Sequence, residues 1–270
     1  MKKIYLIFLF LAITILSISV QKHRYALVSH QEIWLAKKYT RELSKQEKKS
    51  LHAFLKRATV MNVCSYTWGG NKPMTIVNFS KDDVEMNNGW AIWESFLPLF
   101  QRQGYHIARY EDLNNRPYYE IVVFSIPLCR SVIAAHLQPF QEFIGEQSDV
   151  EGVLNILLNH HDPRFLMIMK NEYFLGLLLG FGGQNAVSFA AGKYDQMDFS
   201  FSLPWWQNFV LEGVWPPVGW LMPSFRCDLN TEETKGLLRQ YAQDRKAIFW
   251  TYLGYDLVDV TFALLMHPNP

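Results

Sequence analysis

The chain has 270 residues, enough for one large domain or two small ones, and 49% of them are hydrophobic against 19% charged. The net charge of +1 hides an asymmetry, because residues 22–57 carry ten lysines or arginines against three acidic residues, whereas residues 58–270 carry fourteen against twenty-two. The acidic main part of the chain argues against a nucleic-acid partner.

The N-terminus has the composition of a membrane-targeting segment. Lys2 and Lys3 precede seventeen uncharged, mostly apolar residues, 4–20. A membrane-spanning helix needs about 20 apolar residues, with a lower limit of about 17. The apolar part of a signal peptide is shorter, about 7–15 residues, and ends in a cleavage site. We therefore expect residues 1–20 to be an uncleaved signal anchor. The alternative is a signal peptide cleaved near Ser19, which would release a secreted protein.

The charges flanking this segment bear on its orientation. Lysines lie on both sides, and residues 22–41 are slightly the richer side, so the positive-inside rule favours neither orientation strongly. Because three residues precede the apolar run and a long domain follows it, we expect a single-pass membrane protein with the main domain outside the cytoplasm. We expect residues 21–58 to form a basic helical stalk. Residues 22–57 of this stalk could contact anionic lipid headgroups, or could be a solvated helix face.

In the first half of the chain, hydrophobic spacing and turn residues predict alternating short elements. Ser44 and Glu47 have capping-box spacing, which predicts a helix over about 45–58. Another helix is expected to start near His30. The other expected elements are strands at 61–64 and 74–79 around a turn at 68–73, a helix over 90–103 after Asn88-Gly89, and a strand over 118–126.

In the second half the expected elements are almost all helices. Ser148 with Glu151, and Asn230 with Glu233, again have capping-box spacing. The expected elements are a helix over 131–143 broken or kinked at Pro139, a helix after Ser148 that ends at His160, and a buried, mainly helical segment over 165–180 that could instead turn at 170–172. They also include a helix over 186–194 and a long helix from Asn230 that is closed by Gly254.

These elements predict an α+β fold, predominantly helical with a small β-sheet, in which residues 59–270 form a single globular domain. The three cysteines, Cys64, Cys129 and Cys227, are widely spaced, and no C-x-x-C occurs. This excludes a zinc ribbon or a thioredoxin-like motif and favours free, buried thiols. We predict no metal site and no cofactor.

The nearest approach to a functional motif is the glycine-rich turn at 180–185, which precedes a predicted helix. Backbone N–H groups at such a turn can bind an anion, with Gly182, Gly183 and Asn185 as the candidate residues. The turn fits neither a dinucleotide fingerprint nor a P-loop. The more conservative interpretation is a tight turn between two helices.

Two weak catalytic candidates also stand out. His160, His161 and Asp162 place two imidazoles and a carboxylate together at a helix end, where histidine also simply favours the helix dipole. Cys64 could pair with a distant histidine as a nucleophile. No established hydrolase motif accompanies either candidate, so an enzyme of the hydrolase type is the alternative hypothesis rather than the main one.

The segment 199–225 is unusually rich in aromatic residues and proline. Its four tryptophans, which would suit a groove, an interface or a membrane surface, are Trp205, Trp206, Trp215 and Trp220. The alternative is an irregular segment whose aromatic side chains fill the core. Taken together, the sequence favours a membrane-anchored or exported binding domain whose ligand or partner the motifs do not identify.

Overall fold

The structure is a computed structural model that describes residues 12–14, 16–17, 19–22, 26–111, 117–145, 148–193, 197–199, 223 and 225–266. The predicted membrane segment, 4–20, lies largely outside these ranges, as do the four tryptophans of segment 199–225. Across the described ranges, none of the helices combines the length and the apolar character needed to cross a membrane.

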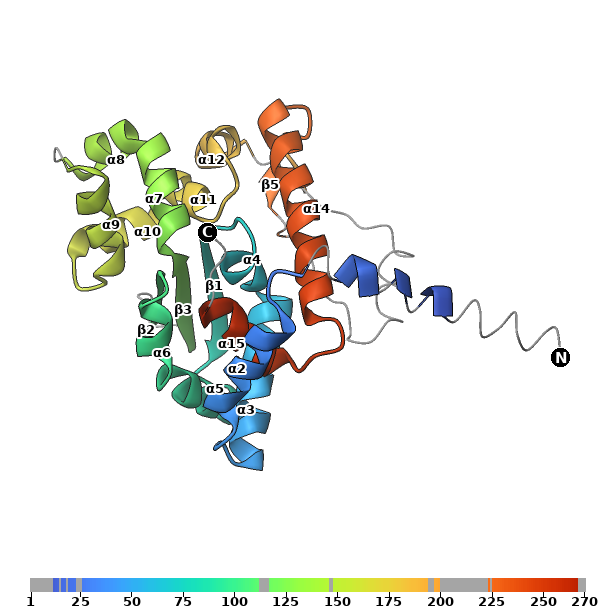
Figure 1. The fold of residues 1–270 in the computed structure, drawn as a ribbon. Helices are drawn as coiled ribbons and strands as arrows, with labels where there is room; N and C mark the ends of the chain where they lie inside the picture. Colours follow the sequence, from blue (N-terminus) through green and yellow to red (C-terminus); the bar gives the residue numbers. More distant parts are fainter. Residues whose placement is uncertain are drawn as a thin grey trace.

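The fold is predominantly helical with a small antiparallel sheet, as the sequence predicted (Figure 1). The strands are β1 (Met74–Ser80), β2 (Tyr105–Glu111), β3 (Tyr118–Ser125), β4 (Asp198–Phe199) and β5 (Arg226–Cys227). The helices of the first half are α2 (His30–Thr40), α3 (Lys45–Lys56), the π-helical turn η1 (Arg57–Met61), α4 (Ser65–Trp68), α5 (Val84–Glu94) and α6 (Leu97–Gln101). The later helices are α7 (Ile126–Ala135), α8 (Leu137–Ile144), α9 (Val150–Leu158), α10 (Pro163–Lys170), α11 (Glu172–Leu178), α12 (Gly183–Ala190), α14 (Glu232–Tyr252) and α15 (Leu257–Met266).

The main sheet has the order β1-β3-β2, with both pairs antiparallel. Its central strand, β3, is buried on both faces from Ile121 to Ser125, because helices cover the sheet from two sides (Figure 1). Successive side chains of a strand point to opposite faces. Ile121 and Val123 therefore join one hydrophobic cluster, whereas Val122 and Phe124 join another.

These two clusters form the core. The larger one packs side chains of α2, α3, α5, α14 and α15 against one face of the sheet, with Trp90, Trp93 and Phe262 among its largest members. The second packs α7 to α12 against the other face. The helices α2 and α3, within the predicted basic stalk, contribute Phe54 and other buried residues to the larger cluster, so they are packed into the folded body.

Several sequence-based predictions are wrong in an informative way. Residues 61–64 form no strand, because the chain continues from α3 into η1 and Val63 takes a φ of 53°, in the left-handed region. Gly89 lies inside α5 rather than before a helix. A Cβ at this position would overlap Ser50 O and Phe54 Cβ of α3, so the glycine permits two helices to cross closely.

Two predicted helices are divided. The stretch 90–103 is split between α5 and α6 at Ser95, whose hydroxyl bonds the carbonyl of Ile92 at 2.7 Å. The stretch 131–143 belongs to α7 and α8, which divide at His136 rather than at the predicted Pro139. Pro139 falls in the first turn of α8, where its missing N–H is not needed. Strand β2 and helix α15 had not been predicted.

Of the three predicted capping boxes, the one formed by Ser44 and Glu47 is confirmed. At the other two sites the neighbouring residue is the N-cap: Asp149 caps α9 and Thr231 caps α14. In both cases the acidic residue expected at position N3 does not bond the N-cap backbone and instead contacts another part of the protein. Glu151 binds Arg130, and Glu233 binds the backbone of α12.

Helix α14 carries a buried face that is unusually polar. Asp244 accepts hydrogen bonds from the backbone N–H of Asn71 at 2.9 Å and from its side-chain amide at 2.8 Å. Tyr241 donates to the carbonyl of Gly180 at 2.7 Å. Near the C-terminal end of the helix, Thr251 accepts from the backbone N–H of Leu27 at 2.8 Å. A single helix thus holds three segments that lie far apart in the sequence.

Lys72, in the turn after α4, is 3% exposed. Its ammonium group donates to the carbonyls of Met74 and Leu179, each at 2.8 Å, and so joins the start of β1 to the end of α11. Burial lowers the pKa of Lys72 to about 7, with the nearby Cys64 acting in the opposite direction. In the unfolded chain this lysine would be protonated up to about pH 10.4.

This difference predicts a pH-dependent stability. Between about pH 7 and pH 10 the unfolded state binds the proton of Lys72 and the folded state does not, so the free energy of unfolding rises with pH, by at most about 1.4 kcal/mol per unit. We expect the stability of the wild type, relative to Lys72→Met, to increase between pH 7 and pH 9 in urea unfolding. An identical difference at both pH values would contradict the lowered pKa.

Candidate functional site

The structure places the cysteine candidate in an unreactive environment. The side chain of Cys64 is fully buried at the N-terminus of α4. Burial raises the pKa of its thiol, and the charge of Lys72 only partly opposes this. A reactive cysteine needs a lowered pKa and access from solvent, and Cys64 has neither.

The cluster His160-His161-Asp162 forms the corner between α9 and α10. Asp162 is the N-cap of α10 and pairs with Arg164 at 2.7 Å, and these bonds lower its pKa to about 2. His160 and His161 are exposed, and the ring of His160 packs edge-on against Tyr110. The structure does not bring this corner together with Cys64, since Tyr110 and Cys64 belong to the clusters on opposite faces of the sheet. Among the described residues no three histidine, cysteine or acidic side chains converge as metal ligands would.

The glycine-rich turn binds a carboxylate, and this carboxylate is the side chain of Glu233 in the same protein. The backbone N–H groups of Gly183 and Gln184, at the start of α12, donate to the two carboxylate oxygens of Glu233 in α14, each at 2.8 Å. Gly182 has a φ of 87°, and a Cβ there would lie 2.8 Å from Leu237 and 2.9 Å from the carboxyl carbon of Glu233. The turn therefore joins α12 to α14.

Asn185 reinforces the same junction. Its side chain is 1% exposed and donates to the carbonyl of Phe181 and the hydroxyl of Thr234, both at 2.9 Å. Its amide oxygen accepts from the backbone N–H of Asp228 at 3.1 Å. All hydrogen-bonding atoms of its side chain thus have partners inside the protein.

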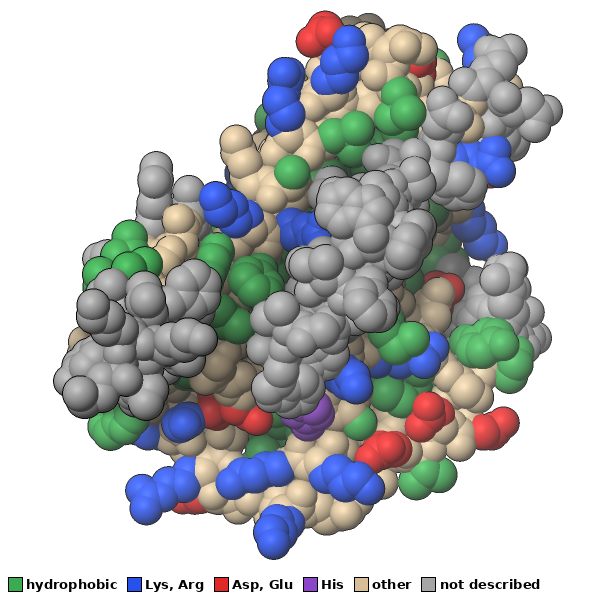
Figure 2. All heavy atoms as spheres, turned by 90° about the vertical axis from the view of Figure 1, so that its right-hand side faces the viewer, with side chains coloured by type: hydrophobic (Ala, Val, Ile, Leu, Met, Phe, Trp, Pro, Cys, Tyr) green, Lys and Arg blue, Asp and Glu red, His purple; other side chains and the backbone are tan. Residues whose placement is uncertain are grey.

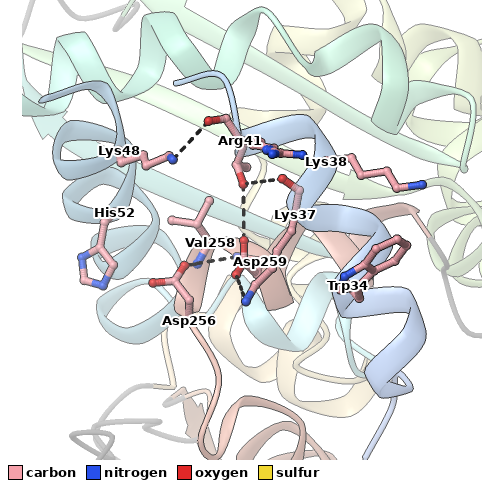
Figure 3. A pocket seen from close by; sticks show the side chains of 10 residues that line it. Trp34, Lys37, Lys38, Arg41, Lys48, His52, Asp256, Val258 and Asp259 are labelled. Atoms are coloured by element: carbon pink, nitrogen blue, oxygen red, sulfur yellow. Dashed lines mark hydrogen bonds and ion pairs between the residues drawn. The ribbon is translucent and has the colours of Figure 1, made fainter. Parts of the chain in front are cut away.

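A basic pocket lies elsewhere, between α2, α3 and the start of α15, with a volume of about 690 Å³ (Figure 3). We define it by its lining residues Trp34, Lys37, Lys38, Thr40, Arg41, Lys48, His52, Asp256, Val258 and Asp259. Figure 3 shows Lys48 and His52 of α3 on one side of Asp256 and Asp259, and Trp34 and the lysines of α2 on the other side, with the Lys38 side chain extending outward. Four cationic side chains face two carboxylates, so the pocket carries a net positive charge.

The carboxylates of Asp256 and Asp259 both form hydrogen bonds or ion pairs within the protein. Asp256 accepts hydrogen bonds from the backbone N–H groups at the start of α15, the shorter one at 2.9 Å from Val258. Asp259 pairs with Lys37 at 3.5 Å and accepts from the hydroxyl of Thr40 at 3.3 Å. Burial, together with the neighbouring charge of Asp256, raises the pKa of Asp259. The acidic residues thus fix α15 against α2 rather than neutralising the whole pocket.

The remaining cations face solvent without a carboxylate. Within the described part of the chain, Lys38, Arg41 and Lys48 form no ion pair with an acidic residue. The ammonium of Lys38 lies 4.7 Å from the centroid of the Trp34 ring, and Trp34 is 57% exposed. This arrangement of cations around an open cavity suits an anionic group, and the exposed indole suits a surface that is partly apolar.

The loop that ends at Asp256, a lining residue of the pocket, also contacts the end of the N-terminal segment. Lys22 donates to the carbonyl of Leu253, and its ammonium lies 3.6 Å from the centroid of the Tyr255 ring. The hydroxyl of Tyr255 also contacts His30 Nδ1 at 3.1 Å. Figure 2 views the right-hand side of the molecule in Figure 1, and lysine and arginine side chains gather along the lower part of this face.

The charge excess of residues 22–57 indicated the cations of this pocket, whereas no sequence pattern pointed to Asp256, Asp259 or the exposed Trp34. The acidic partners come from a helix more than 200 residues further along the chain, and no local pattern marks them. In the comparisons with known proteins, no family model, curated protein or solved structure matches the chain.

The junction at Gly182 predicts a strong substitution effect. In Gly182→Ala the backbone conformation, with φ 87° and ψ 157°, is one that essentially only glycine adopts and costs about 1–3 kcal/mol, and the added methyl group collides with Glu233 and Leu237. We expect the free energy of unfolding to fall by at least about 2 kcal/mol in urea titrations of the full chain in detergent. Gly236→Ala is the matched control on α14, because a Cβ there meets nothing within 4 Å and should stabilise the helix by up to about 1 kcal/mol. Equal effects of the two substitutions would contradict the role of the turn.

Proposed function

We propose that this protein is a membrane-anchored binding domain that holds the anionic headgroup of a lipid in the basic pocket. The observation that carries the proposal is the position of the pocket. Its lining residue Asp256 directly follows Tyr255, whose ring Lys22 contacts just beyond the apolar segment 4–20.

The anchor itself rests on the sequence. Residues 4–20 have the length and composition of a signal anchor. The described part of this segment includes helical residues with exposed apolar side chains, Ile13, Leu16 and Val20, each more than half exposed. Exposed apolar side chains at this position favour contact with lipid over contact with water. On the same sequence grounds we expect the main domain to lie outside the cytoplasm.

The distance between anchor and pocket is short. Lys22 contacts Leu253 and Tyr255, and Asp256, the next residue, already lines the pocket. Consecutive Cα atoms are 3.8 Å apart, so Leu253 and Asp256 are separated by at most about 11 Å. A helix that enters the bilayer close to Lys22 would therefore bring the pocket near the headgroups of the same leaflet.

The chemistry of the pocket suits a phosphate that carries an apolar tail. Lys38, Arg41 and Lys48 supply charge-assisted donors, and a cavity of about 690 Å³ is large enough for a glycerophosphate headgroup. Trp34 offers a half-exposed indole, the side chain that gathers at the membrane interface. A soluble phosphate would satisfy the cations but would not need the exposed indole.

The alternative function, a hydrolase using Cys64 or the His160–Asp162 cluster, has less support. Cys64 is fully buried with a raised pKa, and the carboxylate of Asp162 is held by Arg164. Neither site presents a nucleophile next to a base in an open pocket, which this chemistry requires.

The proposal predicts that anionic lipid stabilises the folded domain through the pocket. We would reconstitute the full chain in phosphatidylcholine nanodiscs with increasing phosphatidylglycerol and measure the midpoint of thermal unfolding. The midpoint should rise with anionic lipid and less so at high salt. In the triple variant Lys38→Gln, Arg41→Gln, Lys48→Gln most of this rise should be lost, since each charge near the surface contributes about 1 kcal/mol.

The matched control is Lys45→Gln, Lys56→Gln, Lys170→Gln, which removes three exposed lysines outside the pocket. If this control loses the effect as fully as the pocket variant, the attraction is diffuse and the pocket is not a headgroup site. A second arm adds glycerol phosphate to phosphatidylcholine nanodiscs. Stabilisation by the soluble phosphate, but not by phosphatidylglycerol, would contradict lipid recognition.

A further inference from the structure

A second cavity, with a volume of about 480 Å³, lies between α4, the turn that follows it, the start of α7 and the middle of α14. Its apolar lining includes Leu27, Trp68 and Leu128, and its polar lining includes Ser125 and Asp244. Among the described residues that line it, none is a lysine, arginine or histidine. A concave site with an apolar wall and a few polar groups is the usual form of a ligand pocket.

Asp244 brings a buried carboxylate without a counter-ion to this cavity. The residue is 7% exposed, and no described lysine, arginine or histidine pairs with it. Asn71 donates one hydrogen bond to each carboxylate oxygen, and burial nevertheless raises the pKa of Asp244. A carboxylate has about four acceptor positions, so each oxygen can accept a further bond. Because a buried charge is costly without an opposite charge, an ammonium group on a ligand would stabilise this carboxylate.

The start of α7 brings unused hydrogen-bond donors to the same cavity. Its N-cap residue, Ser125, is 7% exposed, and the hydroxyl of this serine bonds neither the helix nor any other described residue. The N–H of Ile126 donates to the carbonyl of Gly104, and Pro127 has no N–H. The N–H of Leu128 has no acceptor in the described part of the chain. Because a helix N-terminus carries a partial positive charge, these donors suit a carboxylate.

The carboxylate and the donors lie within reach of one small molecule. The backbone N–H of Asn71 donates to Asp244 at 2.9 Å. Two residues further along, the carbonyl of Pro73 accepts from the backbone N–H of Ser125 at 2.8 Å. Consecutive Cα atoms are 3.8 Å apart, so those of Asn71 and Pro73 are separated by at most about 7.6 Å. One three-residue segment therefore holds both polar groups of the cavity.

We propose that this cavity binds a free α-amino acid with an apolar side chain. The ammonium group bonds the carboxylate of Asp244. The carboxylate of the ligand accepts from the hydroxyl of Ser125 and the N–H of Leu128, and its side chain lies against Leu27 and Trp68. A simple acid or a simple amine would leave one of the two polar groups unpaired. This site is separate from the basic pocket and does not depend on its function.

The test is equilibrium dialysis of radiolabelled L-leucine and L-phenylalanine against the full chain in phosphatidylcholine nanodiscs, with empty nanodiscs subtracted. We expect saturable binding of at least one amino acid. The analogues of leucine that lack one charged group are 4-methylpentanoate and 3-methylbutylamine, and those of phenylalanine are 3-phenylpropanoate and 2-phenylethylamine. Each analogue should bind at least tenfold more weakly than its parent amino acid.

Ser125→Ala should weaken amino-acid binding at least fivefold, because hydrogen bonds to a charged group are the stronger ones. The matched control is Ser131→Ala, an exposed position of the same helix that does not line the cavity. Leu128→Trp, which fills the cavity from a half-buried position, should abolish binding. The proposal is overturned if neither amino acid binds saturably, if an analogue binds as tightly as its parent, or if Ser125→Ala behaves like Ser131→Ala. Thermal unfolding of each variant confirms that it is folded.

Discussion

The fold depends on the buried polar face of α14. Along this helix Glu233, Tyr241, Asp244 and Thr251 each bond the backbone of a segment that is remote in the sequence. Two of these segments are glycine turns, which can approach the helix closely because no Cβ intervenes; a Cβ on Gly70, for example, would lie 2.9 Å from Asp244 Oδ2. Buried polar groups are costly unless all are paired, so the partners must come together or not at all. The need to pair every buried polar group on α14 therefore selects one arrangement of the helices. Hydrophobic contacts alone would allow the helices to shift along one another.

The proposed function depends on the loop that follows α14, because this loop contacts both the N-terminal segment and the basic pocket. The loop after it, Leu253–Asp256, receives Lys22 and His30 on one side and starts α15 on the other. Helix α15 then supplies Asp259, which pairs with Lys37 and positions α2. The end of the N-terminal segment and the basic pocket are thus attached to the same four-residue loop. An anchor that restrains the chain near Lys22 would also restrain the orientation of the pocket, which reduces the entropy lost when a headgroup binds.

Local features were predictable from the sequence, and tertiary partners were not. Strand β3 and the helix after Ser44 were predicted because a β-branched run and a capping box act within a few residues. Gly89 was misread because its reason is the crossing with α3, and Glu233 was misread as a local cap because its partner lies on α12. The same limit applies to the basic pocket: a charge count finds the basic run 22–57, but the pocket also needs the start of α15, which no local pattern links to that run.

The most direct test of the account is the orientation of the anchored domain at the bilayer. The three native cysteines are buried, so a cysteine introduced at His52, in the pocket, or at His161, on the exposed corner between α9 and α10, can be labelled selectively with a fluorophore. Quenching by headgroup-labelled lipid would then be measured for the full chain in vesicles that contain phosphatidylglycerol. The account predicts strong quenching at position 52 and weak quenching at position 161. Equal quenching at both positions, or stronger quenching at 161, would contradict a pocket that faces the membrane.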